Sequence, residues 1–259
     1  MKRHFRLPIL LILLIILSVI ICDQAYKRLI YPTLPDIHVL DQLPLEKGKV
    51  PVFDNSGRFL FDYEGFSEEK EILTLDEFSP NLIAAVIATE DRTFFTNRGF
   101  SILAIIRASI QNHVFRQTFS GASTITQQLV KNVLEPPDER YEQSYARKIK
   151  EVFIAFEVTK AYSKDKILEI YLNEMYFGGY TNGAEASAQS LFGISARELT
   201  LEQAARIAGM PQAPIFYSRP ENGDALDARQ EEVIHIMQRI WEKDQCIFIG
   251  ENRPPVCAP

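Results

Sequence analysis

The stretch GASTITQQLVKN, residues 121–132, is the part of the sequence that most limits which folds and reactions are possible for this chain. Small residues lead into a hydroxyl-rich helix start, where free backbone N–H groups and the positive end of the helix dipole favour an anion such as phosphate. Lys131 follows Thr124 by nearly two helical turns, so both residues lie on one face of the predicted helix. A capped loop has the same pattern, but a Walker loop is excluded because no Gly-Lys-Ser/Thr ending follows.

Charged residues lie on both sides of this stretch. Glu90 and Asp91 follow an apolar helix, where the negative end of the helix dipole disfavours acids, so their position indicates a role. A solvated helix end is the simpler interpretation of the same pair. Downstream, Arg147 and Glu151 stand four residues apart and form either a surface ion pair or, with Lys148, a grip for a diphosphate.

The rest of the sequence predicts a mainly α-helical domain. From Ser79, a good N-cap, apolar residues recur at helical spacing along most of the chain. Residues 50–61 predict a β-hairpin, because 54–57 is a turn-rich tetrad between short apolar runs. The stretch 100–119 carries more apolar residues than one helix face needs, which either core burial or a membrane-dipping lobe explains.

Composition excludes several classes of protein. With 259 residues, 46% of them hydrophobic and 24% charged, the chain predicts a folded globular domain rather than a disordered one. The net charge of −6 argues against nucleic acid as a partner. Cys246 and Cys257 are close enough in sequence to pair in an oxidising compartment, and they could equally remain free.

The first 25 residues predict a membrane anchor. A basic start precedes an uncharged run from Leu7 to Cys22, somewhat shorter than the ~20 residues that span a bilayer comfortably. A cleaved signal peptide has the same basic start and apolar core, but the residues before Asp23 lack the small side chains of a cleavage site. An uncleaved anchor is therefore favoured, with the basic side in the cytoplasm and the rest of the chain outside.

The order of these patterns resembles that of the bacterial peptidoglycan glycosyltransferases, family 51. Together with the segments between them, the matching stretches cover about residues 76–220. In the order of the five family motifs they are EDRTF (90–94), GASTITQQ with KN (121–132), RKIKE (147–151), KILEIYLNE (166–174) with Tyr176 and Gly178, and LEQAA leading to GMPQAP (201–214).

The resemblance implies a lysozyme-like, two-lobed domain with a head and a membrane-proximal jaw, preceded by one N-terminal transmembrane helix. The jaw would include the apolar stretch 100–119. The chain would lie in the bacterial inner membrane as a single-pass protein, with its catalytic domain on the periplasmic or extracellular side. The expected divisions are 1–25 for a cytoplasmic stub and anchor, 26–75 for a linker with a hairpin, 76–222 for the catalytic core, and 223–259 for a C-terminal helix and tail.

The implied activity is the polymerisation of lipid II into β-1,4-linked glycan with release of undecaprenyl diphosphate. Glu90 matches the family's general base, and Glu151 matches its second essential acid. Lys166, Glu169 and Tyr171 would frame the cleft. The residues expected to bind the substrate and its diphosphate are Asp91, Phe94, Gly121, Ser123, Thr124, Gln128, Lys131, Arg147, Lys148 and Asn173.

The expected partners are lipid II, the growing glycan strand, membrane lipid and a penicillin-binding transpeptidase. No metal-ligand spacing stands out, although Mg²⁺ or Mn²⁺ bridging diphosphate and carboxylate is compatible with the sequence. The chain ends soon after the fifth motif, which predicts a monofunctional enzyme without a transpeptidase domain.

The sequence departs from the family pattern at a few positions. Asn97 stands where the family has a histidine, and an asparagine can form hydrogen bonds but cannot titrate. Ser101 stands where an aspartate is common, and Ala122 replaces a glycine. A non-catalytic membrane scaffold therefore remains an alternative. A glycan-cleaving enzyme is another, although it needs no cations for a diphosphate.

Overall fold

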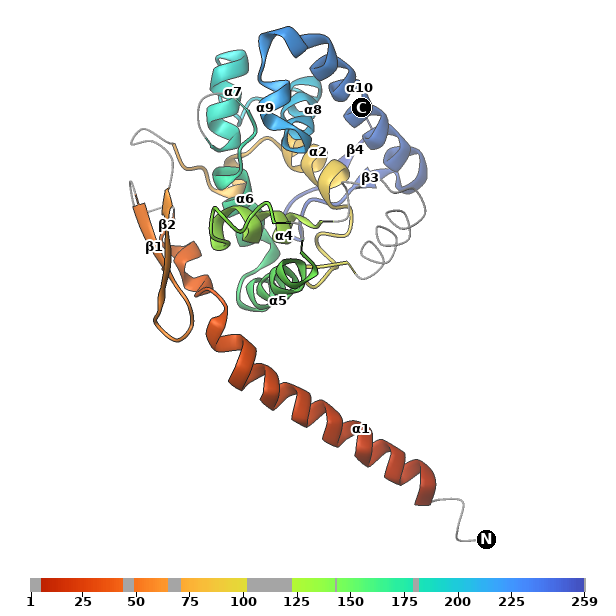
Figure 1. The fold of residues 1–259 in the computed structure, drawn as a ribbon. Coiled ribbons are helices and arrows are strands. Elements are labelled where there is room, and N and C mark those ends of the chain that lie inside the picture. The colour runs from red at the N-terminus through yellow and green to blue at the C-terminus, as the bar shows by residue number, and fades with distance from the viewer. Residues whose placement is uncertain are drawn as a thin grey trace.

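The computed structural model describes residues 6–43, 49–64, 71–101, 123–142, 144–178 and 182–258, with side chains from residue 14 onward. Helices make up most of the body, so the mainly α-helical prediction is confirmed (Figure 1). Gly121 and nearly all of the predicted jaw stretch, from residue 102 onward, lie outside the described residues.

Helix α2 (Pro80–Glu90) is the central helix of the body. Pro80 occupies its first position, and every residue from Leu82 to Ala88 is buried, so the helix is enclosed on all sides. Helices α8 (Leu201–Gly209) and α10 (Gly223–Asp244) pack against it. Because α2 ends at Glu90, the packing of three helices fixes the position of this residue.

A second group of helices carries the second, third and fourth predicted motifs. Helix α4 (Ile125–Leu129) contacts both α5 (Tyr145–Ala161) and α6 (Lys164–Glu174). The two longer helices begin at serine N-caps, since Ser144 and Ser163 each accept a hydrogen bond from a backbone N–H of the first turn.

Shorter segments complete the helical body. The remaining helices and single turns are η1 (Tyr26–Ile30), η2 (Tyr31–Thr33), η3 (Ile37–Asp41), η4 (Leu75–Glu77), η5 (Val130–Leu134), α7 (Ala184–Phe192), η6 (Met210–Gln212), α9 (Pro214–Tyr217) and η7 (Pro220–Asn222).

The expected β-hairpin is present, and in sequence it lies between the N-terminal helix and the central helix α2. Strands β1 (Lys49–Phe53) and β2 (Phe59–Glu64) pair antiparallel, with alternate residues buried. Asp54 stabilises the turn by accepting hydrogen bonds of 2.9 Å from the N–H groups of Ser56 and Arg58. Gly57 adopts a φ of +83°, which a glycine accommodates without strain.

Helix α1 (Arg6–Ala25) extends away from the body (Figure 1). Within the described ranges, no helix has both the length and the apolar character needed to cross a membrane. The expected transmembrane helix therefore stays a prediction.

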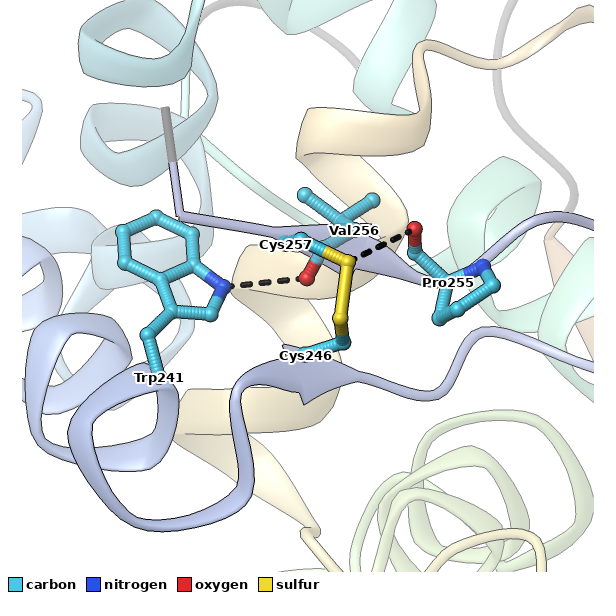
Figure 2. Close-up of a disulfide and its surroundings, with 5 residues drawn as sticks. All are labelled: Trp241, Cys246, Pro255, Val256 and Cys257. Atoms are coloured by element: carbon cyan, nitrogen blue, oxygen red, sulfur yellow. Dashed lines mark hydrogen bonds between the residues drawn. A yellow bond between two sulfur atoms is a disulfide. The ribbon is translucent and has the colours of Figure 1, made fainter.

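The C-terminal tail is closed by a disulfide bond between Cys246 and Cys257, so of the two alternatives left open by the sequence the structure has the paired one. Figure 2 shows the bond joining the short strands β3 (Cys246–Ile247) and β4 (Val256–Cys257). The indole N–H of Trp241, near the end of α10, donates a hydrogen bond of 3.0 Å to the carbonyl of Val256. The tail is therefore anchored to the last helix.

The same tail packs against the segment that follows Glu90. The rings of Phe248 and Phe95 meet edge to face, with centroids 5.0 Å apart. Arg253 forms ion pairs with Asp165 at 2.9 Å and with Asp76 at 2.7 Å. The tail thus connects the start of α6, the turn before α2 and the loop after it.

Replacing both tail cysteines by serine should lower the free energy of unfolding by about 2–3 kcal/mol, because the bond closes a short loop and restricts the unfolded chain. The cysteines are 11 residues apart. Urea unfolding of the double variant, with and without reductant, measures the loss. Replacement of the exposed, free Cys22 is the control, and equal stability of all three proteins would contradict the prediction.

Gly99 is required where the loop after Glu90 passes over α5. Its φ is +89°, and a Cβ atom there would lie 2.3 Å from the carbonyl oxygen of Ala155 and 2.6 Å from the hydroxyl of Thr159. Gly99→Ala should therefore lower the free energy of unfolding by about 1–3 kcal/mol, through strain and overpacking. Thermal unfolding tests this, with Gly223→Ala as a control in open space. An unchanged midpoint in Gly99→Ala would show that the backbone moves freely.

Candidate active site

Glu90 accepts a hydrogen bond at its carboxylate from Gln128, whose Nε2 lies 2.6 Å away. Gln128 belongs to α4, and its Oε1 accepts a hydrogen bond of 2.9 Å from the hydroxyl of Tyr171 on α6. An amide that receives a donor at its oxygen presents its N–H group on the other side. Tyr171, expected only to frame the cleft, therefore orients Gln128 toward Glu90.

The surroundings of Glu90 raise the pKa of its carboxyl, which favours a role as a base. Burial raises the pKa of the Glu90 carboxyl above its usual range, while the hydrogen bond from Gln128 and the charge of Arg229 oppose the shift. A general base is most effective when its pKa approaches the working pH, so the shift has the useful direction. Burial also raises the pKa of Tyr171 well above its usual value, which keeps its hydroxyl protonated as a donor.

Asp91 organises the loop that follows Glu90. Its Oδ1 accepts hydrogen bonds from the N–H and the hydroxyl of Thr93, at 3.1 and 2.9 Å. Its Oδ2 accepts one of 2.8 Å from Asn97 Nδ2 and one of 3.3 Å from the N–H of Ile125. Asn97 thus supplies a donor at the family's histidine position, and the contact with Ile125 connects the loop to the start of α4.

Glu151 lies at the centre of a buried cluster of charges. Its Oε1 accepts a hydrogen bond of 2.8 Å from Gln127 and contacts the ammonium of Lys148, and its Oε2 lies 2.9 Å from Arg147. Only 14% of the Arg147 side chain and 2% of the Glu151 side chain are exposed, so they are not a solvated surface pair. Lys148 also donates to the hydroxyl of Ser123 at 2.9 Å.

Glu135 joins this cluster, and the sequence analysis missed it. It is fully buried, and its Oε2 lies 2.9 Å from the same nitrogen of Arg147 that contacts Glu151. Among the described residues, its Oε1 has no hydrogen-bond partner. Burial raises the pKa of the Glu135 carboxyl, and Arg147 opposes the shift. No local signal marks Glu135, because an acid before two prolines looks like a solvated turn residue.

Two adjacent glutamines connect the two halves of the site. Gln127 donates to Glu151 and Gln128 donates to Glu90, from successive positions of α4. Successive helical residues point in directions about 100° apart, so one short helix can serve a carboxylate on each side. The second motif therefore holds the candidate base and the cation cluster in a common frame.

Lys131 differs from the other two predicted cations. Across the part of the chain that the structure describes, no carboxylate lies within 4.0 Å of its ammonium, which instead lies 4.9 Å from the ring centroid of Tyr141. Burial and the charge of Arg147 lower the pKa of Lys131. Glu151 and Glu135 oppose this shift from a distance, but neither is in contact with the ammonium. A half-buried ammonium with no carboxylate in contact has unused capacity for an anion. Lys131 is therefore well suited to contact a phosphate.

The remaining predicted residues shape the site. Thr124 caps α4, since its hydroxyl donates to the carbonyl of Gly99 at 2.6 Å and accepts from the N–H of Gln127 at 3.1 Å. Phe94 is fully buried and packs against its neighbour in the same loop. Asn173 is buried and donates to a backbone carbonyl before α2 at 2.8 Å. Thr124 and Asn173 thus join elements that are far apart in sequence.

The chain is similar in sequence to proteins of known families. A family model described as "Transglycosylase" matches residues 56–238. Penicillin-binding protein 1A of Escherichia coli K12 is 37% identical over 211 residues, which are 81% of this chain and 24% of that protein. Penicillin-binding protein 1A of Neisseria gonorrhoeae is 35% identical over 224 residues, which are 84% of this chain and 27% of that protein. Penicillin-binding protein 1A of Rickettsia prowazekii is 36% identical over 189 residues, which are 72% of this chain and 23% of that protein.

The chain thus spans about a quarter of the length of these curated relatives. The matched range includes Glu90, the α4 segment and the charge cluster around Glu151. The family model and the relatives agree with the five ordered motifs. On these grounds, this chain belongs to the transglycosylase family, whose peptidoglycan glycosyltransferase motifs it carries.

Proposed function

We propose that this chain is a peptidoglycan glycosyltransferase that polymerises lipid II into β-1,4-linked glycan and releases undecaprenyl diphosphate. The observation that carries the proposal is the pairing of a partly buried carboxylate, Glu90, with a cluster of cations through adjacent residues of α4. Joining a sugar hydroxyl to a diphosphate-activated sugar needs a base for the hydroxyl and cations for the departing diphosphate. The site supplies both.

In the proposed reaction, Glu90 takes the proton from the 4-hydroxyl of the acceptor lipid II. The oxygen attacks the anomeric carbon of the MurNAc that ends the growing strand. A new C–O bond forms as the bond between that carbon and the diphosphate breaks, and the electron pair leaves with undecaprenyl diphosphate. The configuration inverts, which gives a β linkage. The hydrogen bond from Gln128 holds the Glu90 carboxylate in place during this step.

The cations would act on the leaving group. We assign Lys131 to direct contact with the diphosphate, because no described carboxylate lies within 4.0 Å of its ammonium. Arg147 and Lys148, held by Glu151, would provide further positive charge, and Ser123 with Thr124 would shape the loop beside them. Fixed cations stabilise charge that develops in the transition state more effectively than water does.

A divalent ion has limited support from this chain's own residues. The unpartnered Oε1 of Glu135 is a ligand that Mg²⁺ or Mn²⁺ could use. Within the described ranges, however, no group of three metal-ligating side chains comes together.

We also propose that the chain is anchored in the inner membrane by its N-terminus, with the domain on the outer side. The uncharged run 7–22 after a basic start supports the anchor. The disulfide bond between Cys246 and Cys257 supports an oxidising compartment outside the cytoplasm. A penicillin-binding transpeptidase that cross-links the glycan is the expected partner at that surface.

Transfer fits the site better than the two alternatives. A glycan-cleaving enzyme with the same fold needs an acid to protonate a sugar leaving group, and it needs no cations for a diphosphate. A scaffold that lost its activity would not need to keep the loop after Glu90 ordered. Asn97 keeps that loop ordered by donating to Asp91.

Incubation of the full chain with labelled lipid II in detergent tests the proposal. We expect a ladder of polymer on gels and release of undecaprenyl diphosphate in equal amount to the linkages formed. A parallel incubation with preformed glycan serves as the second arm. Cleavage of that glycan without polymer formation would favour the lytic alternative, and binding of lipid II without either product would favour the scaffold.

A further inference from the structure

Lys164, the first residue of α6, has surroundings that none of the assigned roles explains. Its ammonium lies 3.0 Å from Oδ1 of Asn97 and 4.6 Å from the ring centroid of Phe94. Both neighbours belong to the loop that follows the candidate base. A lysine placed against an amide oxygen and an aromatic face is held by directed contacts on two sides. Lys164 therefore connects the start of α6 to the loop after Glu90.

The contacts of Asn97 extend this connection toward Glu90. Asn97 donates from Nδ2 to Oδ2 of Asp91 at 2.8 Å, and Asp91 directly follows Glu90. The same oxygen accepts the N–H of Ile125, which begins the helix carrying Gln128. Lys164 thus acts on both elements that hold the Glu90 carboxylate.

On the basis of the proposed glycosyl transfer, we infer that Lys164 is a positioning residue, which ties Asn97 to the start of α6 and through it positions the loop that follows Glu90. An ammonium can only donate hydrogen bonds, and an ionised carboxylate can only accept them. Lys164 and the N–H of Gly99 both donate to the amide oxygen, at 3.0 and 2.9 Å, and Asp91 accepts from the amide nitrogen. Of these partners, Lys164 is the one that ties the amide to α6. Its hydrogen bond weakens when the ammonium loses its charge and is absent with an apolar side chain.

The charge state of Lys164 makes the role measurable. Burial lowers the pKa of Lys164 to about 8, and the charge of Asp91 opposes the shift. Asp91, at the end of α2, is the charged group that faces the ammonium. The adjacent Asp165 on α6 is paired with Arg253 of the tail. Above the folded pKa the amine is neutral, so we expect polymerisation to fall as the pH rises through about 8.

The effect on stability has the opposite sign, which separates positioning from folding. The folded pKa of about 8 lies below the 10.5 that is usual for a lysine, so the unfolded chain binds more protons between these values. Stability contributed by this group therefore rises with pH across that window, and at neutral pH the buried ammonium is unfavourable. Lys164→Met should accordingly lose activity without a lower unfolding midpoint.

The test compares Lys164→Met, Lys164→Arg and the exposed control Lys160→Met in the full chain, with lipid II as substrate. We expect Lys164→Met to lower kcat by about 10- to 100-fold with little change in KM, because the base is misplaced and no substrate contact is lost. Lys164→Arg should recover most of the rate, and its alkaline limb should move to higher pH because arginine stays protonated. Lys160→Met should behave as the wild type.

A second readout needs no activity. In NMR spectra, the resonance of the Asn97 side-chain amide should shift as the pH passes through about 8 in the wild type, because Lys164 loses its proton there. The resonance should not shift in Lys164→Arg. Unchanged kcat in Lys164→Met, or an alkaline limb that stays in place in Lys164→Arg, would overturn the inference while leaving the proposed function intact. A wild type that makes no polymer would instead refute the proposed function.

Discussion

Glu90→Gln is expected to lower kcat for lipid II polymerisation by about 10²–10⁴-fold, the usual contribution of a general base. Glutamine has nearly the same shape and can still form a hydrogen bond with Gln128, but it cannot accept the proton of the attacking hydroxyl. KM should change little, because the cations that hold the diphosphate are untouched. Single-turnover polymerisation with labelled lipid II measures the effect.

The fold of this variant should be intact. Burial raises the pKa of Glu90, so the folded state binds more protons than the unfolded state just above the ordinary glutamate pKa. The ionised group therefore disfavours folding at neutral pH, and Glu90→Gln should keep or raise the unfolding midpoint. The same shift predicts where activity is lost as the pH is lowered. Because Glu90 protonates above the ordinary glutamate pKa, the loss should begin above that pKa. Glu231→Gln, an exposed change on α10, is the control, and equal rates in Glu90→Gln and wild type would remove Glu90 as the base.

Arg147→Met is expected to lower the free energy of unfolding by about 3–5 kcal/mol, the usual loss when one partner of a buried ion pair is removed. Its guanidinium contacts Glu135 and Glu151, whose side chains are 0% and 2% exposed. Lys148 would still neutralise Glu151. No other cation in the described ranges lies within 4.0 Å of Glu135, which would be left charged and buried. Urea unfolding measures the loss.

Arg197 provides a matched control for this prediction. It also bridges two glutamates, Glu71 and Glu77, but 37% of its side chain is exposed. Arg197→Met should leave stability almost unchanged, because solvent screens exposed pairs. Adding Glu135→Gln to Arg147→Met should recover a large part of the loss by removing the uncompensated charge. Equal losses in the Arg147 and Arg197 variants, or no recovery in the double variant, would contradict the buried-pair explanation.

Local pattern was sufficient for the helices and for the general class of chemistry. The apolar run before Glu90 predicted an apolar helix, which is present as α2 and is enclosed on all sides. The turn-rich tetrad 54–57 predicted a hairpin that is present. These features depend on neighbouring residues and on the helix and strand periods, which a sequence displays directly. The ordered motifs likewise indicated the family without knowledge of any distance.

Contacts between distant segments depended on three-dimensional packing. Gln128 and Glu90 are 38 positions apart, and Lys164 and Asn97 are 67 apart, so no periodicity brings them together on paper. In the sequence, Glu135 has the pattern of a solvated turn residue. In the structure, the packing of η5 against α5 buries it. Whether Cys246 and Cys257 pair depended on the short strands that place them opposite each other. Side-chain partners across a fold are set by how helices and strands pack, and that packing is a property of the whole chain.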